Sequence, residues 1–85
     1  MAYAVAVQPP SLKAMLCLPK HIQQRIVEKL EDLEVNPRPS GIKALKGQIP
    51  GYRLRVGNYR VLYTVDDKNR TVTVYEIGHR KDVYR

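Results

Sequence analysis

Hydrophobic positions in the first forty residues follow first a strand period and then a helix period. Residues 2–7 place Tyr or Val at every second position between alanines, which predicts a β-strand that ends before two prolines. A short helix is expected over residues 10–19, between Pro-Ser and the next proline. Its apolar face is predicted to contain Leu12, Met15 and Leu16.

A second helix is expected to begin at Pro19 and to end at Asn36, where the next proline stops it. The apolar stripe of this helix consists of Ile22, Ile26, Leu30 and Leu33. Two antiparallel helices with one apolar side need a sheet to cover, so the pattern indicates a helical hairpin packed on a sheet.

The second half of the chain changes to a period of two. Residues 38–50 hold two prolines and two glycines and are expected to form a loop of about a dozen residues, a length typical of functional loops. Alternating runs then occupy residues 52–56, 59–66 and 71–77. They predict a three-stranded antiparallel meander.

The dipeptide Gly-Asn at positions 57–58 is a signal for a two-residue hairpin. It pairs Val56 with Tyr59, and counting back from the turn pairs Arg55 with Arg60. Like charges directly opposite each other destabilise a sheet unless an anion lies between them. Because such broken local rules often mark function, we expect both arginines on a solvent-facing functional surface.

The other side of the same hairpin is predicted to be core, formed by Tyr52, Leu54, Val61 and Tyr63. The next turn is expected to take three residues, 67–69, with Asn69 left-handed, although a loop of four residues is also open. Three residues would pair Arg60 with Glu76 and, if the strand continues, send Arg80 to the face of Arg60. A plain salt bridge between Arg60 and Glu76 on a solvated surface is the alternative to a functional site.

Composition adds a charge imbalance to this picture. The 85 residues are expected to form one domain, 1–85, and they carry 15 Lys and Arg against 8 Asp and Glu, a net charge of +7. Residues 1–42 hold five basic and four acidic side chains, whereas residues 43–85 hold ten and four, a net charge of +6. Five of the six tyrosines are also in the second half. Rings interleaved with arginines favour a nucleic-acid partner.

Several other classes of protein are not expected. Cys17 has no partner for an internal disulfide, and with only two histidines the chain shows no metal-ligand spacing, so neither a metal nor a cofactor is predicted. The apolar residues 2–7 are too few for a signal peptide or a membrane span. We therefore expect a soluble cytoplasmic protein with no membrane partner.

If the arginine-bearing face cleaves RNA, the nucleophile has to come from the substrate, because the sequence offers no metal cluster and no Ser-His-Asp spacing. The 2′-hydroxyl of RNA can attack the adjacent phosphate and leave a 2′,3′-cyclic phosphate and a 5′-hydroxyl. Guanidinium groups suit the negative charge that gathers on the phosphate oxygens. Arginine is a poor general base, because it stays protonated.

Residues 51–63 and 77–84 resemble the RelE branch of the RelE/ParE toxin superfamily, through the strings Gly-Tyr-Arg-Leu-Arg-Val-Gly-Asn-Tyr-Arg-Val-Leu-Tyr and Ile-Gly-His-Arg-Lys-Asp-Val-Tyr. The resemblance implies an α+β fold, an antiparallel sheet with an N-terminal strand and a two-helix hairpin packed on one face. It implies a ribosome-dependent endoribonuclease that cleaves messenger RNA in the A site and inhibits translation. The implied partners are a cognate antitoxin, in a hetero-oligomer, and the ribosome with its messenger RNA.

The resemblance also assigns catalytic roles. Arg53 and Arg55 occupy two positions that are usually lysine in the best-known members, which favours charge stabilisation here over a role as base. Arg60 matches the arginine that holds the scissile phosphate, and Arg80 matches the one near the leaving 5′-oxygen. Tyr84 matches a terminal tyrosine that stacks on a base or assists proton transfer.

Further RNA contacts are expected from Lys43, Lys46, His79 and Lys81. The two lysines of the loop are equally consistent with plain solvated charge, and strict alternation points His79 away from Arg80. Two rival functions stay open, a ParE-like inhibitor of DNA gyrase and a non-catalytic module that binds the ribosome or RNA. A gyrase inhibitor would not need Arg60, Arg80 and Tyr84 together. A non-catalytic binding module would not depend on any single arginine.

Overall fold

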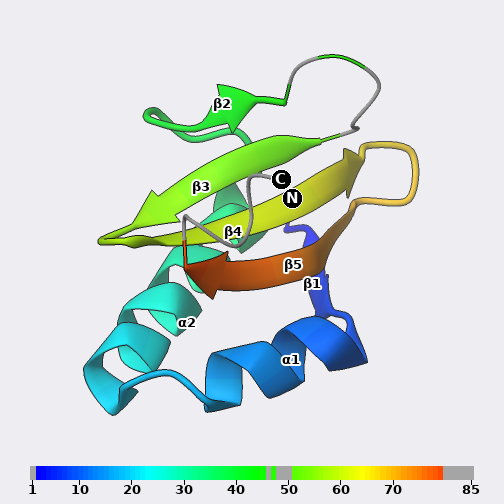
Figure 1. Cartoon of the computed structure of the whole chain (residues 1–85). Coiled ribbons are helices and arrows are strands. Elements are labelled where there is room, and N and C mark those ends of the chain that lie inside the picture. The colour runs from blue at the N-terminus through cyan, green and yellow to red at the C-terminus, as the bar shows by residue number, and fades with distance from the viewer. Residues whose placement is uncertain (1, 46, 48–50, 80–85) are drawn as a thin grey trace.

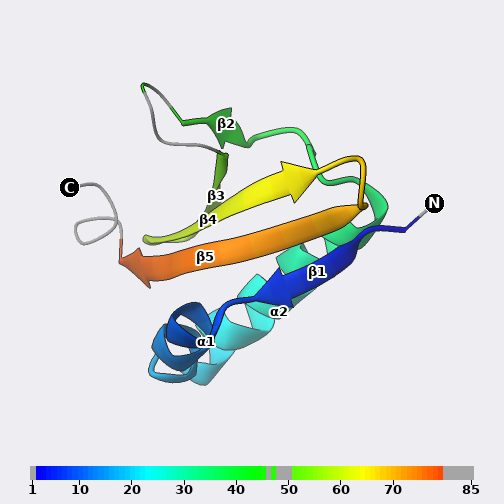
Figure 2. The same cartoon turned by 90° about the vertical axis from the view of Figure 1, so that its right-hand side faces the viewer.

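The computed structural model describes residues 2–45, 47 and 51–79. Its elements, in chain order, are β1 (Ala4–Val7), α1 (Pro9–Leu16), α2 (Lys20–Val35), β2 (Lys43–Ala44), β3 (Tyr52–Val56), β4 (Tyr59–Asp66) and β5 (Thr71–His79). In this part of the chain the strands form one five-stranded sheet in the order β1-β5-β4-β3-β2 (Figure 1). Both helices lie on the same face of the sheet (Figure 2), which confirms the α+β fold with a helical hairpin on one side.

The sheet is antiparallel except at one edge. β2, β3, β4 and β5 pair antiparallel, as the meander predicts, but β1 pairs parallel to β5 with Ala4 opposite Thr71 and Val7 opposite Val74. The sequence-based expectation of an antiparallel sheet did not include this parallel edge. β1 reaches it because the chain leaves β1 through both helices and returns by the meander, which ends beside β1.

The second helix is the one that the hydrophobic period predicted. α2 ends at Val35, and its predicted apolar stripe, Ile22, Ile26, Leu30 and Leu33, is buried. Pro19 is the N-cap of this helix and not its first residue.

The predicted face of the first helix was right for Met15 and wrong for Leu12 and Leu16. Leu12 and Leu16 are 42% and 62% exposed, while Ser11 and Met15 are buried. α1 packs against β5, and Ser11 and Ala14 line a pocket together with Ile77 of that strand. A hydrophobicity count does not anticipate this rotation, because it ranks Leu12 above the small Ser11, which is the residue that is buried.

β4 is the central strand and carries the middle of the core. Val61 and Tyr63 are fully buried beneath α2, together with Val72 and Val74 of β5. The hydroxyl of Tyr63 donates to the carbonyl oxygen of Pro37 at 2.8 Å, so this buried phenol is satisfied. Burial raises the pKa of Tyr63 to about 12.

The predicted hairpin register is confirmed in full. Val56 lies opposite Tyr59, and Arg55 lies opposite Arg60. Gly57 adopts a left-handed φ of 59° in the turn.

The register predicted for the next strand pair was wrong, because the turn takes four residues and β4–β5 contains a register shift at Leu62/Tyr63. Arg70, not Asn69, has the positive φ of 51°. Asn69 instead donates from its backbone and side-chain amides to the Asp66 carboxylate, at 3.1 and 2.8 Å. Arg60 consequently lies opposite Gly78, and Glu76 lies opposite Leu62.

The segment predicted as a loop contains a short strand. Lys43 and Ala44 form β2, opposite Arg53 and Tyr52 of β3. The amide of the next residue, Leu45, donates to the carbonyl oxygen of Gly51 at 3.0 Å and closes this corner of the sheet.

Gly51 should tolerate a side chain poorly. Its φ is 102°, and a Cβ at this position would overlap the carbonyl oxygen of Tyr63 in β4. We expect Gly51→Ala to lower the free energy of unfolding by roughly 2–4 kcal/mol, from backbone strain and forced separation of strands. Gly57→Ala is the matched control, since its φ is also positive but nothing lies within 4 Å, so only about 1–2 kcal/mol is expected. Equal losses in urea denaturation would contradict the close approach at residue 51.

Candidate nucleic-acid interface

The face of the sheet opposite the helices carries a group of basic side chains from three strands. We call it the arginine face and define it by Lys43 of β2, Arg53 and Arg55 of β3, and Arg60 and Leu62 of β4. Alternation along β3 and β4 separates these residues from the core residues between them. Figure 2 shows that the described helices leave this side of the sheet uncovered.

Two adjoining rows of residues cross the arginine face. In one row Arg55 lies opposite Arg60, and in the other Lys43, Arg53 and Leu62 are successive neighbours. Lys43 and Arg55 are exposed, and Arg53 is half-buried. Four cationic residues are therefore neighbours on one face of three adjoining strands, which favours a polyanionic ligand.

Arg60 differs from its neighbours in being buried. Only 7% of the residue is exposed, whereas the sequence led us to expect a solvent-facing side chain. It lies on the central strand, with β3 and β5 on its two sides. The guanidinium donates from Nη1 to the carbonyl oxygen of Tyr59 at 3.2 Å. A held guanidinium at the edge of solvent is suited to stabilise an anion with little reorganisation.

Leu62 is a member of this face that residue-type reasoning missed. It is 5% exposed although it lies on the side away from the helices, and it follows Arg60 by two positions on the same strand. An apolar residue between cationic groups lowers the local dielectric and strengthens their interaction with a bound phosphate. The alternation that placed Leu62 opposite Arg53 was the signal that could have identified it.

Glu76 is the acidic residue that joins the second row. It lies opposite Leu62 and is exposed, so the predicted direct pairing with Arg60 is wrong. The four-residue turn and the extra residue at the β4–β5 register shift each move the pairing by one position and together place Gly78 opposite Arg60. The alternative interpretation, a plain salt bridge between Arg60 and Glu76, required the two residues to be cross-strand partners, and they are not.

His79 lies on the opposite side of the sheet from Arg60. Its cross-strand neighbour is Tyr59, and the two rings meet edge to face with centroids 5.6 Å apart and planes at 83°. This agrees with the alternation argument. The structure therefore does not bring His79 to the arginine face.

Four predicted site residues, Lys46, Arg80, Lys81 and Tyr84, lie outside the described residues. The structure brings together the other basic candidates, Lys43, Arg53, Arg55 and Arg60.

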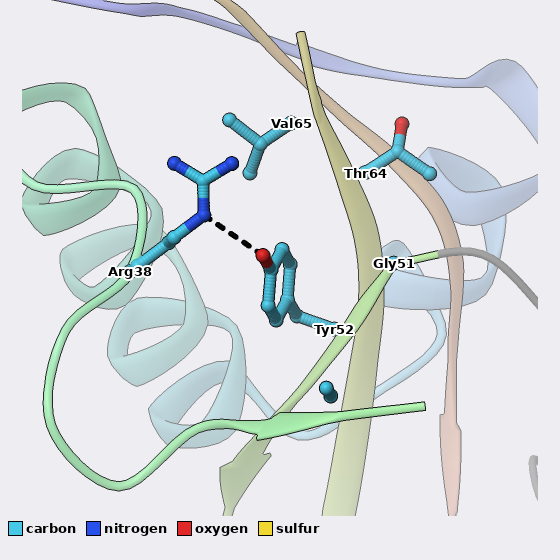
Figure 3. A pocket seen from close by; sticks show the side chains of 6 residues that line it. Arg38, Gly51, Tyr52, Thr64 and Val65 are labelled. Atoms are coloured by element: carbon cyan, nitrogen blue, oxygen red, sulfur yellow. Dashed lines mark hydrogen bonds between the residues drawn. The ribbon is translucent and has the colours of Figure 1, made fainter. Parts of the chain in front are cut away.

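A second polar cluster, which the sequence did not indicate, lies at one end of the sheet, and Figure 3 shows two of its members, Arg38 and Tyr52. We call it the Arg38 cluster and define it by Arg38, Tyr52, Asp67 and Tyr3. Arg38 donates from Nε to the Tyr52 hydroxyl at 2.8 Å and from Nη1 and Nη2 to the Asp67 carboxylate at 3.0 and 2.8 Å. Tyr3 donates its hydroxyl to the same carboxylate at 2.7 Å.

The Arg38 cluster borders a cavity of about 280 Å³. The lining residues are Arg38, Ala44, Gly51, Tyr52, Thr64 and Val65. Hydrogen bonds from Arg38 and then Tyr3 lower the pKa of Asp67 to about 2. The hydrogen bond to Asp67 in turn raises the pKa of Tyr3. These contacts join residues 29 and 64 positions apart, so no local pattern could have revealed them.

Within the described residues no group of three or more His, Cys, Asp and Glu side chains could hold a metal ion. Cys17 is an exposed free thiol. None of the helices described is long and apolar enough to cross a membrane.

Comparison with known protein families gives a match over most of the chain. A family model described as the ParE toxin of type II toxin–antitoxin system, parDE, matches residues 11–84. Toxin RelG of Mycobacterium tuberculosis is 34% identical over 87 residues, covering 100% of this chain and 99% of RelG. The putative toxin RelE1 of Methanocaldococcus jannaschii is 33% identical over 88 residues, covering 100% and 98% of the two chains.

Solved structures give the same fold. A chain of the archaeal RelE–RelB complex from Pyrococcus horikoshii superposes with a TM-score of 0.84 at 32% identity, covering 94% of this chain and 97% of that chain. A mutant of Escherichia coli toxin RelE in the free state gives a TM-score of 0.81 at 25% identity, with 98% and 88% covered.

The Arg38 cluster predicts a specific response to acid. A carboxylate whose folded pKa is lowered from 3.8 to about 2 adds stability above its unfolded pKa, and this contribution is lost as the pH falls through about 2. We therefore expect the free energy of unfolding to fall more steeply in wild type than in Asp67→Asn between about pH 4 and pH 2. Above about pH 5 the two curves should run parallel.

Glu28→Gln, on the exposed side of α2, is the matched control and should keep the acid slope of the wild type. Urea denaturation as a function of pH measures all three proteins. A wild-type slope that Asp67→Asn does not change would show that the Asp67 carboxylate has the same pKa in the folded and unfolded states.

Proposed function

Because the chain belongs to the RelE-like branch of the RelE/ParE toxin superfamily, the toxins of type II toxin–antitoxin systems, we propose that it cleaves messenger RNA on the ribosome. The arginine face is the proposed site. The reaction proposed is attack of the RNA 2′-hydroxyl on the adjacent phosphate, in the ribosomal A site, which stops translation.

The observation that carries this proposal is the pair Arg55 and Arg60. The two residues lie directly opposite each other, and Arg60 is held nearly buried beside the apolar Leu62. Cross-strand like charges are destabilising, and a phosphate between them removes the repulsion. In the proposed reaction the 2′-oxygen bonds to phosphorus, the bond from phosphorus to the 5′-oxygen breaks, and Arg60 stabilises the charge on the non-bridging oxygens.

The remaining roles follow the family resemblance. Arg53 and Arg55 are proposed to stabilise charge, since neither can act as a base. Arg80 is proposed to act near the leaving 5′-oxygen, and Tyr84 to transfer a proton or to stack on a base.

Peripheral contacts complete the proposed site. Lys43, Lys46 and Lys81 are proposed to contact phosphates, and Lys43 is the one that the structure describes beside Arg53. His79 is not proposed to touch the substrate through the arginine face, because it lies on the other side of the sheet. The ribosome is proposed to align the 2′-hydroxyl with the adjacent phosphate. Such alignment helps a site that has no dedicated general base.

A cognate antitoxin is the proposed protein partner, in a hetero-oligomer. Structural relatives of this chain come from RelE–RelB complexes. The net charge of +6 in residues 43–85 favours an acidic antitoxin segment that folds on contact. A toxin that acts on translating ribosomes works in the cytoplasm, which is the location that we propose.

The alternative is a ParE-like inhibitor of DNA gyrase, and the matching family model is described as a ParE toxin. A non-catalytic module that binds the ribosome or RNA is a third possibility on the same basic surface. The opposed arginines favour RNA cleavage over both, because a charge-collecting surface does not require a buried guanidinium on its central strand.

Replacing Arg60 should remove cleavage while largely keeping the fold. We expect Arg60→Ala to lower the rate on programmed ribosomes by roughly 10² to 10³, the usual loss for one preorganised donor. Arg60→Lys should lose most of the activity as well, because an ammonium cannot form the same planar fork. Relief of the repulsion from Arg55 offsets part of the lost packing, so the free energy of unfolding should change by less than about 1 kcal/mol.

The matched control is Arg25→Ala on α2, which removes the same charge from an exposed position away from the arginine face. New messenger RNA ends in an in vitro translation reaction provide the readout. Full-rate cleavage by Arg60→Ala would remove this residue from the catalytic set. Intact messenger RNA with stalled gyrase would select the gyrase alternative, and intact messenger RNA with tight ribosome binding would select the non-catalytic module.

Association with the antitoxin should depend strongly on salt. Opposite charges steer association, and at about 0.5 M salt the Debye length is too short for steering, so we expect the association rate constant to fall about tenfold or more from its value at about 0.05 M. Stopped-flow mixing with the cognate antitoxin measures this. An association rate that does not change with salt would show that opposite charge does not guide the partner.

A further inference from the structure

We propose that Arg38 is a positioning residue for the arginine face: it ties β2 and the start of β3 to the rest of the sheet and so places Lys43 and Arg53. The expected effect of replacing Arg38 on RNA cleavage rests on the proposed function. The expected effect on the local order of β2 does not. Arg38 touches neither row of the arginine face directly, so its influence has to pass through Tyr52 and the connection between α2 and β2.

One guanidinium joins segments that are distant in the sequence. Arg38 follows α2, Tyr52 begins β3, and Asp67 lies in the turn between β4 and β5. Asp67 is held in addition by Tyr3, just before β1. The guanidinium carbon also lies 5.4 Å from the centroid of the Tyr52 ring. The Arg38 cluster therefore fastens the α2–β2 connection to the start of β3 and to the β4–β5 turn. Figure 3 shows the first of these contacts, between Arg38 and Tyr52.

The adjoining residue strengthens this attachment. The carbonyl oxygen of Pro37 accepts the hydrogen bond from the buried hydroxyl of Tyr63, and the rings of Tyr63 and Tyr52 lie 5.7 Å apart. Residues 37 and 38 are thus tied to neighbouring positions of β4 and β3, which are themselves cross-strand partners.

The path from Arg38 to the arginine face is short. Tyr52 precedes Arg53 and lies opposite Ala44, and Arg53 lies opposite Lys43. β2 contains two residues, far fewer than a strand needs to be stable by itself. Its place beside β3 therefore depends on what holds the connection before it, and among the described residues the Arg38 cluster and the Pro37–Tyr63 hydrogen bond do so.

Arginine suits this role better than lysine. A planar guanidinium binds a carboxylate through two parallel hydrogen bonds and still offers Nε to a third group. The side chains of Arg38 and Asp67 are 41% and 55% exposed, so solvent screens the ion pair and a large contribution to global stability is not expected. The expected consequence of losing the cluster is local, at the two-residue strand.

The test compares local order with cleavage in the same variants. Amide hydrogen exchange reports local order through the amide of Leu45, which bonds to Gly51 at the end of β2. In Arg38→Lys this exchange should be about tenfold faster or more, while amides of the β4–β5 pair stay within about twofold of wild type. Tyr52→Phe removes only the hydroxyl that Arg38 holds and should give a smaller change in the same direction.

Cleavage on programmed ribosomes should then lose roughly ten- to a hundredfold in kcat/KM for Arg38→Lys, mainly through KM, because displaced phosphate contacts weaken binding. Asp67→Asn should reproduce the defect, and the double variant should be no worse than either single one. Lys68→Gln is the matched control, since it removes a charge from an exposed position in the same turn and leaves Arg38, Tyr52, Asp67 and Tyr3 in place, and it should keep nearly wild-type exchange and cleavage.

Unchanged exchange of the Leu45 amide in Arg38→Lys would overturn the proposal. Faster exchange with wild-type kcat/KM would also overturn it, because β2 would then be displaced without effect on the arginine face. If wild-type protein does not cleave at all, the proposed function fails, and binding of single-stranded RNA by Arg38→Lys then decides whether Arg38 places Lys43 and Arg53.

Discussion

The antiparallel pairing of β3 with β4 is the constraint on which both faces of the sheet depend. A turn of two residues fixes Val56 opposite Tyr59, and every later pair follows from it. Because side chains alternate, the pairing sends Leu54 and Val61 beneath the helices and Arg55 and Arg60 to the other side. A slip of one residue would exchange the two faces.

The relative energies explain why this register persists despite the opposed arginines. Like charges across a sheet cost some tenths of a kcal/mol up to about 1 kcal/mol. Each core side chain that a slip would expose contributes roughly 1.5–3 kcal/mol when buried. Burial of the core side chains therefore decides the register. The outer face can hold the opposed charges of Arg55 and Arg60, which destabilise the fold slightly and suit an anionic ligand.

Local patterns predicted the parts of this fold that local physics decides. The α2 stripe and the β3–β4 register needed only a helical period and a turn dipeptide. The β4–β5 register was missed because the turn takes four residues, with Asn69 bonded to Asp66 and Arg70 left-handed, and because the strand pair contains a register shift. The burial of Arg60 and the Arg38 cluster arise from contacts across the sheet. The residues that make these contacts are far apart in the sequence, so a local sequence pattern cannot predict them.

The most direct test of the account is the chemistry of the ends that cleavage leaves. Messenger RNA is cleaved on ribosomes with the purified toxin, and the fragments are examined by mass spectrometry. Attack by the substrate's own 2′-hydroxyl predicts a 2′,3′-cyclic phosphate on the upstream fragment and a 5′-hydroxyl on the downstream one. A 3′-hydroxyl with a 5′-phosphate would mean that water is the nucleophile, and it would contradict the role proposed for the arginine face.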